Sequence, residues 1–226
     1  MKEKVIVSWS GGKDSALALL EVIRTEEYEI AALLTTVTQE YDRVSMHGVR
    51  RVLLEQQAES IGVPLEKVLI SENCSNEDYE SRMREVLEKY LAAGVGAVVS
   101  GDIFLEEVRR RREDNLSKVG MRAVFPLWKR DTGELAGEFI EAGFKAVITC
   151  VDSNTLCKMF AGRSFDKGFL SELPCGVDAC GENGEFHSFV YDGPIFRERV
   201  SIKAGAVVLQ ENGFYYCDLY PEPKPV

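Results

Sequence analysis

The fold follows from one stretch of sequence, Ser8-Trp9-Ser10-Gly11-Gly12-Lys13-Asp14-Ser15. The apolar run Val5-Ile6-Val7 comes directly before it, and the helix-forming run Ala16-Leu17-Ala18-Leu19-Leu20 comes directly after it. This order predicts a strand, a tight turn and a helix. Such a turn presents free backbone N–H groups and the positive end of the helix dipole to one point. The stretch therefore predicts an anion site, best suited to a chain of phosphates.

The side chains of this turn also suit phosphates. Gly11 and Gly12 let the backbone approach an anion without a Cβ atom in the way, and Lys13 adds a point charge. Two hydroxyl donors come from Ser10 and Ser15. A carboxylate beside phosphates requires a cation between them, or it must turn away to cap the helix. The flanking carboxylate is therefore our candidate Mg²⁺ ligand, Asp14.

The turn fits neither of two common phosphate motifs. Walker A requires four residues between its first glycine and Gly-Lys-Ser/Thr, and the dinucleotide fingerprint requires G-x-G-x-x-G. Instead, Ser10-Gly11-Gly12-Lys13-Asp14-Ser15 resembles the pyrophosphate-binding loop of the PP-loop ATP pyrophosphatases. The resemblance implies that ATP is cleaved between its α- and β-phosphates, giving an adenylated substrate and pyrophosphate. The alternative, a glycine-rich turn that binds nothing, is less favoured because consecutive positions match at a strand-to-helix junction.

Length and composition indicate an ordinary globular protein. With 226 residues, 45% of them hydrophobic, the chain suits one large core, or one domain and a smaller second one. The start Met1-Lys2-Glu3-Lys4 enters the first predicted strand without the apolar core of a signal peptide. No apolar run is long enough to span a membrane. We therefore expect a cytoplasmic protein with no membrane partner.

Charge argues against a nucleic-acid partner, because the formal net charge is −10 and binding a nucleic-acid backbone depends on neutralising phosphates. The basic cluster Arg109–Arg112 has acidic neighbours on both sides, as in a helix face that is solvated or meets a small anion. The six cysteines are expected to be reduced thiols. Cys175 and Cys180 have a spacing that suits two metal ligands, but little else in the sequence supports a zinc site.

Strand and helix patterns alternate through the first half of the chain. Apolar, β-branched runs predict strands at residues 29–37, 65–70, 97–100 and 122–125. Helices are predicted between them, at residues 49–61, 75–94 and 105–119. The alternation predicts an α/β fold with a Rossmann-like parallel sheet that helices cover on both faces.

Ligands bind beyond the carboxyl ends of the strands in such sheets. Thr35 and Thr36 lie at one of these ends, where they are candidates to line an adenine and ribose pocket, although β-branched residues are also ordinary in strands. Gly101 and Asp102 follow the strand at 97–100. They are placed to direct a backbone N–H or a carboxylate at a nucleotide or its magnesium.

The second half has a different composition. Pro126-Leu127-Trp128 marks the predicted junction between a nucleotide-binding domain, 1–125, and a smaller α+β domain, 126–226, because proline cannot donate to a strand ladder. The smaller domain is predicted to contain a helix at 132–143, loops and short helices at 152–184, and strands at 144–151, 200–210 and 214–220. Asn212-Gly213 predicts a type I′ turn between the last two strands.

The stretch from Gly181 to Phe196 is the second informative one. Glu182, Glu185 and His187 gather beside glycines, and an alternating apolar strand follows. Clustered carboxylates in such a turn do not belong to a core. They are either solvent-facing turn residues or part of a site that recognises an amine, an ammonium ion or a metal.

Several motifs together resemble the PP-loop family that includes diphthine–ammonia ligase, and they cover nearly the whole chain. They are the loop at Ser10, Met46-His47-Gly48, Gly101-Asp102-Ile103, Pro126-Leu127-Trp128 and the stretch from Gly181 to Phe196. The resemblance implies ATP-dependent amidation, in which a carboxylate is adenylated, ammonia attacks, and AMP and pyrophosphate leave. The implied partners are ATP with Mg²⁺, ammonia, and an acceptor carboxylate on a protein or a small molecule.

Site roles follow from the resemblance. The pyrophosphate loop is Ser10–Ser15, and the implied catalytic residues are Lys13, Asp14, Asp102, Glu182 and Glu185. Nucleotide or substrate contacts are implied for Thr35, Thr36, His47, Gly101 and Arg109, with Arg109 facing the phosphates and Arg112 pairing with its neighbour Glu113.

One departure leaves the acceptor open. Proteins that make diphthamide usually have Glu-Gly-Gly-Glu, an aromatic, Glu and Thr, whereas this chain has Glu182-Asn183-Gly184-Glu185-Phe186-His187-Ser188. This resembles bacterial relatives that lack a diphthamide target and are linked to cobalamin salvage. Two other classes stay open: a nucleotide sensor without turnover, and a tRNA-modifying enzyme. The second would need a basic groove or an added RNA module, and neither is evident in this acidic sequence. A homo-oligomer is compatible with the sequence.

Overall fold

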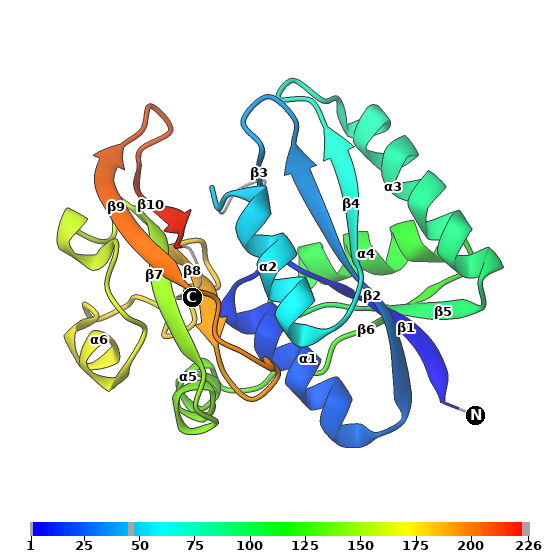
Figure 1. The fold of residues 1–226 in the computed structure, drawn as a ribbon, viewed down its shortest axis with the longest axis horizontal. Helices are drawn as coiled ribbons and strands as arrows, with labels where there is room; N and C mark the ends of the chain where they lie inside the picture. Colours follow the sequence, from blue (N-terminus) through cyan, green and yellow to red (C-terminus); the bar gives the residue numbers. More distant parts are fainter. Residues whose placement is uncertain (1, 45–47, 223–226) are drawn as a thin grey trace.

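A computed structural model describes residues 2–44 and 48–222, and these form two sheets (Figure 1). The first sheet is mainly parallel, with strand order β3-β2-β1-β5-β6 and with β4 paired to β2. Only β3 runs antiparallel to its neighbour in this sheet. Its strands are β1 (Glu3–Ser8), β2 (Tyr28–Thr38), β3 (Arg43–Val44), β4 (Leu65–Ile70), β5 (Val95–Val99) and β6 (Arg122–Val124).

Helices cover both faces of this sheet. Val5 and Val7 of β1 join one buried cluster with α1 (Lys13–Thr25) and α2 (Arg51–Ile61). Ile6 points the other way, into a second cluster with residues of α3 (Asn76–Ala92) and α4 (Glu106–Ser117). A strand with both faces buried is apolar at successive positions, as β1 is. The predicted Rossmann-like fold is therefore confirmed.

The second sheet is antiparallel, with order β8-β7-β10-β9. Its strands are β7 (Lys145–Asp152), β8 (Phe186–Asp192), β9 (Ile202–Leu209) and β10 (Phe214–Pro221). The helices of this half are α5 (Thr132–Glu141), the 3₁₀ turn η1 (Lys158–Phe160) and α6 (Lys167–Glu172). The predicted mixture of strands, loops and short helices after residue 126 is present, and a domain division at residue 125 stays a prediction.

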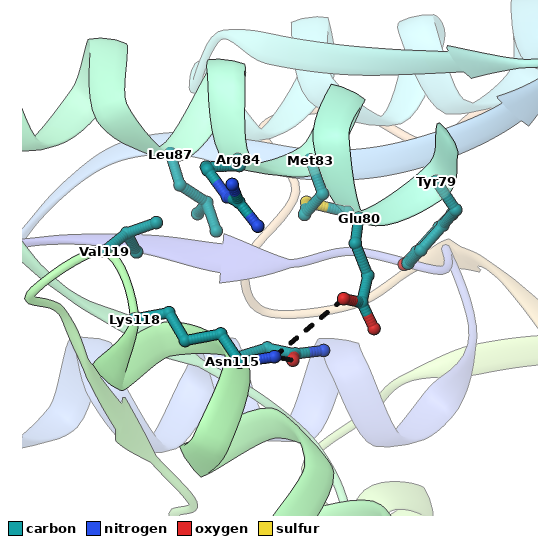
Figure 2. A pocket seen from close by; sticks show the side chains of 8 residues that line it. All are labelled: Tyr79, Glu80, Met83, Arg84, Leu87, Asn115, Lys118 and Val119. Carbon is teal, nitrogen blue, oxygen red and sulfur yellow. Dashed lines mark hydrogen bonds and ion pairs between the residues drawn. The ribbon is translucent and has the colours of Figure 1, made fainter. Parts of the chain in front are cut away.

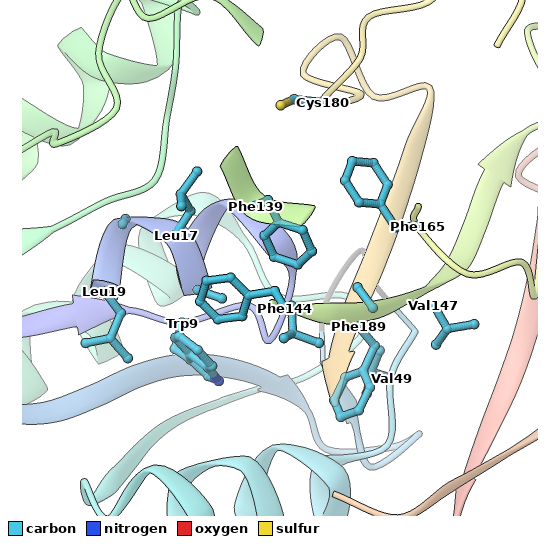
Figure 3. Close-up of a cluster of buried hydrophobic side chains, with 14 of the residues drawn as sticks. Trp9, Leu17, Leu19, Val49, Phe139, Phe144, Val147, Phe165, Cys180 and Phe189 are labelled. Atoms are coloured by element: carbon cyan, nitrogen blue, oxygen red, sulfur yellow. The ribbon is translucent and has the colours of Figure 1, made fainter. Parts of the chain in front are cut away.

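The two halves share one hydrophobic core. Figure 3 shows Trp9 and Leu17 from the first half together with Phe144 and Phe189 from the second, and all four are buried. Helices α1 and α2 lie between the two sheets (Figure 1). The loop that precedes α1 consequently faces the second sheet. In the described part of the chain, no helix combines the length and the apolar character that crossing a bilayer requires.

The turn between β9 and β10 differs from the prediction. A type I′ turn needs positive φ at both central residues, but Gly213 has φ 83° and Asn212 is not in this region. Gly213 N–H donates to the Gln210 carbonyl, and Gln210 N–H donates to the Phe214 carbonyl. The connection is thus a three-residue loop that ends on a left-handed glycine, so the predicted type I′ turn is wrong.

Candidate active site

The loop between β1 and α1 has the backbone geometry of an anion site. Gly11 has φ 77°, and a Cβ atom there would lie 2.7 Å from Gln57 Oε1, so this position requires glycine. Gly12 is the N-cap residue of α1 and offers no side chain to cap it. The Ser15 hydroxyl donates to the Gly12 carbonyl at 2.9 Å, and Ser10 Oγ lies 3.3 Å from Ser15 Oγ. The two predicted hydroxyls thus line the loop together.

Gln57, on α2, fixes the shape of this loop and was not predicted. It is fully buried, its Oε1 accepts from Trp9 Nε1 at 2.9 Å, and its Nε2 donates to the Gly11 carbonyl at 3.0 Å. The same Nε2 donates to the Val190 carbonyl at 2.6 Å. A buried amide with its donor and acceptor satisfied in this way locks the groups that it joins.

The second sheet completes the loop through β8. Ser188 Oγ accepts from the Lys13 N–H at 3.1 Å, and the Val190 N–H donates to the Gly11 carbonyl at 2.9 Å. Ser188 therefore fills the capping position that Gly12 leaves without a side chain. The predicted pyrophosphate loop and the stretch from Gly181 to Phe196 lie against each other, although Ser188 comes 175 positions after Lys13 in the sequence.

Lys13 has a buried ammonium group with few partners. The side chain is 4% exposed, and Nζ lies 3.0 Å from Asp14 Oδ2. The ring centroids of Phe186 and Phe165, both from the second half, are 5.1 and 5.9 Å from Nζ. Burial alone would lower the pKa of Lys13, but the neighbouring Asp14 carboxylate raises it, so the group stays charged.

Asp14 is suited to share a cation with phosphates. Burial raises the pKa of its carboxyl group, and the Lys13 ammonium partly offsets this effect. Mg²⁺ is commonly held by one or two carboxylates together with substrate phosphates, so a single carboxylate beside the loop fits that role. No group of three or more histidine, cysteine or acidic side chains that suits a metal occurs within residues 2–44 and 48–222.

Glu182 joins the predicted substrate side to the sheet. Its Oε1 accepts from the N–H of Ile103, four residues beyond the end of β5, at 2.8 Å. Burial raises the pKa of Glu182 to about 7, and the Asp14 and Asp102 carboxylates contribute in the same direction. Gly101 is pressed against the start of α1, where a Cβ atom would lie 2.7 Å from the Asp14 carbonyl oxygen. The predicted residues Gly101, Asp102 and Glu182 are thus brought together near the loop.

The contacts of α4 differ in part from those predicted. Arg112 Nε lies 2.7 Å from Asp102 Oδ2, so the predicted pairing of Arg112 with Glu113 is wrong. Glu113 instead accepts from Arg109 Nε at 2.8 Å. The Arg109 guanidinium lies 4.6 Å from the ring centroid of Trp128. A role for Arg109 at the phosphates stays a prediction.

Glu185 organises the turn that carries Glu182. It is buried, and its Oε1 accepts from the Asp178 N–H at 3.0 Å and from Asn183 Nδ2 at 3.1 Å. Its Oε2 accepts from the Asn183 N–H at 3.0 Å. These contacts assign Glu185 to the shape of the turn, and its catalytic role stays a prediction.

Two hydroxyls at the carboxyl ends of the strands lack partners among the described residues. Thr35 Oγ1 and Ser100 Oγ are buried without a hydrogen bond. A buried hydroxyl generally has a partner, so a ligand or a water molecule is expected beside each of them. Thr36 is half-buried next to Thr35, and Ser100 was not predicted. The predicted contact residue His47 lies outside the described residues.

The cysteine pair has two different environments. Cys175 is exposed, whereas Cys180 is buried and its thiol donates to the Thr132 carbonyl at 3.3 Å. Burial raises the pKa of the Cys180 thiol to about 12. Cys180 is therefore a neutral thiol beside the site.

A surface pocket lies elsewhere, between α3 and the end of α4 (Figure 2). Its lining consists of Tyr79, Glu80, Met83, Arg84, Leu87, Asn115, Lys118 and Val119. Lys118 and Glu80 form an ion pair of 3.9 Å across it. None of the predicted site residues contributes to this pocket.

Fold and site define the class: a PP-loop protein whose loop is completed by a second, antiparallel sheet. Family comparison gives a narrower assignment. The model of the diphthamide synthase N-terminal domain matches residues 3–123, and that of the diphthamide synthase C-terminal domain matches residues 131–221. The chain belongs to this family, and the predicted resemblance is confirmed.

Curated relatives carry one name, diphthine–ammonia ligase. The Danio rerio protein is 26% identical over a gapped alignment of 234 positions, which covers 92% of this chain and 90% of the relative. The Homo sapiens protein is 26% identical over a gapped alignment of 225 positions, which covers 88% of this chain and 83% of the relative. The Schizosaccharomyces pombe protein is 24% identical, and the match covers 93% of this chain but 38% of that longer protein. These matches support a ligase of this family.

Among solved structures, a predicted subunit of tRNA methyltransferase from Methanocaldococcus jannaschii aligns with a TM-score of 0.43 and 16% identity. The alignment covers 63% of this chain and 77% of that one.

Proposed function

We propose that the chain is an ATP-dependent ligase that adenylates a carboxylate and converts it to an amide with ammonia, releasing AMP and pyrophosphate. The observation that carries this proposal is the junction of the two halves at Lys13. The loop for phosphates contacts β8 through Ser188, and Glu182, four residues before Phe186, reaches the end of β5. Groups suited to ATP and groups suited to an acceptor thus meet at one place.

The reaction proceeds in two steps. An acceptor carboxylate oxygen attacks the α-phosphorus of ATP, the bond between the α-phosphorus and the bridging oxygen breaks, and pyrophosphate leaves. Ammonia then attacks the acyl carbon, the acyl C–O bond to AMP breaks, and the nitrogen loses a proton. Glu182 is suited to accept this proton, because its raised pKa of about 7 lies near neutral pH.

The residues of the site mainly position the substrates and neutralise the charge of the phosphates. The loop N–H groups and Lys13 bind the outer phosphates, where charge develops as pyrophosphate leaves. Asp14 would hold Mg²⁺, which when bound neutralises phosphate charge. The buried hydroxyls of Thr35 and Ser100, which have no hydrogen-bond partner among the described residues, would contact the nucleotide.

The acceptor is either diphthine, as in the name of the relatives, or a small molecule in a cobalamin-salvage-related reaction. His187 stands where diphthamide-forming proteins usually have Glu, and burial lowers its pKa to about 4, so it is neutral at pH 7. The test is mass spectrometry after incubation with ATP, ¹⁵N-ammonium and candidate acceptors. An amide that contains ¹⁵N supports the proposal, whereas ATP binding without pyrophosphate release supports a nucleotide sensor.

Lys13→Ala tests the role of the loop. We expect pyrophosphate release to fall by about 100-fold or more, because a charge at the developing pyrophosphate is lost. The matched control is Lys4→Ala, which removes an exposed lysine that lies 3.8 Å from Glu29. Circular dichroism checks that both variants fold. Unchanged release from folded Lys13→Ala would remove the loop from the mechanism.

A further inference from the structure

Lys13 places a primary ammonium group inside a cage that is built for a monovalent cation. We propose that this cage is the binding site for the ammonium co-substrate, and that the Lys13 head group occupies it until ATP arrives. This inference rests on the proposed function and adds to it the place where the nitrogen source binds. The cage is defined by Asp14, Glu182, Phe165 and Phe186.

The cage offers two kinds of cation contact. The Asp14 carboxylate is 3.0 Å from Nζ, and Glu182 is close enough to interact with Lys13 electrostatically. The faces of Phe186 and Phe165 complete it, with ring centroids 5.1 and 5.9 Å from Nζ. Carboxylates and aromatic faces together recognise ammonium groups, and the interaction strengthens when water is excluded.

Charge balance explains why the cage takes up a cation when Lys13 leaves. Lysine has a flexible stem, so its ammonium is able to turn toward phosphates bound at the loop. The departure removes the counter-charge beside Asp14 Oδ2, on a side chain that is 31% exposed, and beside the half-buried Glu182 carboxylate. Unpaired charge in a partly buried site is costly, so a cation with the same head group is favoured to enter.

At the position of Lys13 Nζ, between Asp14 Oδ2 and the two rings, the donor set favours ammonium over a divalent metal, and a Mg²⁺ ion held by Asp14 and the phosphates would not occupy this position. Mg²⁺ requires an octahedron of oxygen ligands and keeps its water, which two phenylalanine rings do not supply. In the described ranges no third acidic, histidine or cysteine side chain completes a metal site. Potassium resembles ammonium in charge and size, so the experiments must separate these two ions.

The direct experiment uses crystals of the chain soaked with α,β-methylene-ATP and thallium(I), an ammonium analogue with strong anomalous scattering. The inference predicts Lys13 turned toward the phosphates and thallium between Asp14 and Phe186. A nucleotide complex in which Lys13 still fills the cage, or in which the vacated cage contains no thallium, overturns the inference. The first result would also count against the phosphate role of Lys13, whereas a vacated cage without thallium leaves the proposed function untouched, because the function is tested by turnover.

The kinetic experiment uses Phe186→Leu, which removes one π face and keeps an apolar side chain. We expect the KM for ammonium to rise about fivefold, with the KM for ATP unchanged, because a cation–π contact corresponds to about 1 kcal/mol. Phe165→Leu should act in the same direction and more weakly. The control, Phe160→Leu, alters the same aromatic cluster one ring further away, where Phe160 packs on Phe169.

Potassium provides the final arm. In the wild type, potassium should be a competitive inhibitor with respect to ammonium. The same potassium concentration should inhibit Phe186→Leu less strongly. Activation by potassium, or an equal rise in ammonium KM in Phe160→Leu and Phe186→Leu, overturns the inference. Absence of ammonium-dependent turnover in the wild type would instead count against the proposed function, while the thallium result still decides the site.

Discussion

At the scale of single residues, the site places charged groups where burial is costly. Lys13 is almost fully buried beside Asp14, whose side chain is 31% exposed, and Glu182 has its pKa raised to about 7 mainly by burial. Hydrogen bonding from Ile103 only partly offsets this effect on Glu182. A group held in an environment that disfavours its charge is poised to exchange a proton near neutral pH, and it also lowers stability.

Glu182→Gln should therefore stabilise the protein in one range of pH. When the pKa of a carboxyl group is higher in the folded protein than in the unfolded one, the folded protein becomes less stable as the pH rises between the two pKa values. For Glu182 these values are 4.5, its ordinary pKa, and about 7, its pKa in the folded protein. Gln keeps the acceptor for Ile103 and carries no charge. We expect a gain of about 1 to 2 kcal/mol at pH 8, since each pKa unit corresponds to about 1.4 kcal/mol and partial exposure reduces it. No gain is expected at pH 4.

Urea denaturation at pH 4, 6 and 8 measures this difference. The control is Glu172→Gln, which removes an exposed carboxylate whose pKa is lowered by Arg163. That variant should show no gain at pH 8. If Glu182→Gln raises the free energy of unfolding equally at pH 4 and pH 8, the charge of Glu182 is not the cause of the gain.

The sequence predicted the residues of the loop but not those that hold it. The loop at Ser10–Ser15 was predictable because the turn, its glycines and the start of the helix are neighbours in the sequence. Gln57 contacts Gly11 across 46 positions, and Ser188 contacts Lys13 across 175. Neither Gln57 nor Ser188 stands in a pattern that specifies its partner, because these contacts follow from packing of the two sheets. Arg112 was misassigned for the same reason, since Asp102 meets it only after β5 and α4 are packed.

At the scale of elements, α1 depends on β8 for its cap. Gly12 is the N-cap residue, and it leaves the first turn of α1 without a side-chain acceptor. Ser188 provides that acceptor from the second sheet. Helix, loop and strand therefore form one unit, and a change in β8 should be detected at the ATP site.

Ser188→Ala tests this unit. We expect it to lower the free energy of unfolding by about 1 kcal/mol, the usual value for a lost N-cap. ATP affinity should fall roughly fivefold, the factor equal to about 1 kcal/mol, because the loop loses a contact that fixes its shape. Ser188→Thr keeps the hydroxyl and should retain affinity.

Isothermal titration with ATP and urea denaturation provide the two measurements. Ser171→Ala is the control, because Ser171 is exposed and its Oγ donates to the Gly168 carbonyl of the same helix. If Ser188→Ala binds ATP as tightly as the wild type, β8 does not support the loop.

Most elements were predictable from periodicity, whereas the short ones were not. The strands and helices of the first half have apolar patterns long enough to identify. β3 spans two residues, Arg43–Val44, and exists only because β2 extends far enough to pair with it. The turn at Gly213 was misassigned because Asn-Gly suits both a two-residue turn and the last two positions of a three-residue loop.

At the scale of the whole molecule, an ion-pair cluster links the two halves beside their shared core. Arg43 of β3 and Arg50, just before α2, both contact the Asp218 carboxylate of β10, at 2.9 and 2.7 Å. Burial alone would raise the pKa of Asp218, but the hydrogen bonds from the two arginines lower it well below its usual range. Arg50 also lies over the Tyr220 ring, 4.5 Å from its centroid.

Asp218→Asn should weaken the association of the two halves in a pH-dependent manner. A carboxyl group with a lowered folded pKa contributes stability above its unfolded pKa of about 4, and loses it as pH falls further. We expect a loss of about 1 to 2 kcal/mol at pH 7, because the arginine bonds are charge-assisted but partly exposed. The difference from the wild type should shrink progressively below pH 4.

Urea denaturation of Asp218→Asn and the wild type at pH 7 and pH 3 measures the loss in free energy of unfolding at each pH. The control is Asp42→Asn, whose carboxylate pairs with Arg51 and is 60% exposed. Its effect at pH 7 should be much smaller. A loss for Asp218→Asn that does not change with pH would indicate that charge is not the cause.

The central claim is that the loop at Ser10–Ser15 binds ATP for cleavage between the α- and β-phosphates. ³¹P NMR of the products formed from ATP, ammonium and acceptor tests it most directly. The account predicts AMP and pyrophosphate in equal amounts, each dependent on Lys13. ADP and inorganic phosphate, or the same products from Lys13→Ala at the wild-type rate, would contradict it.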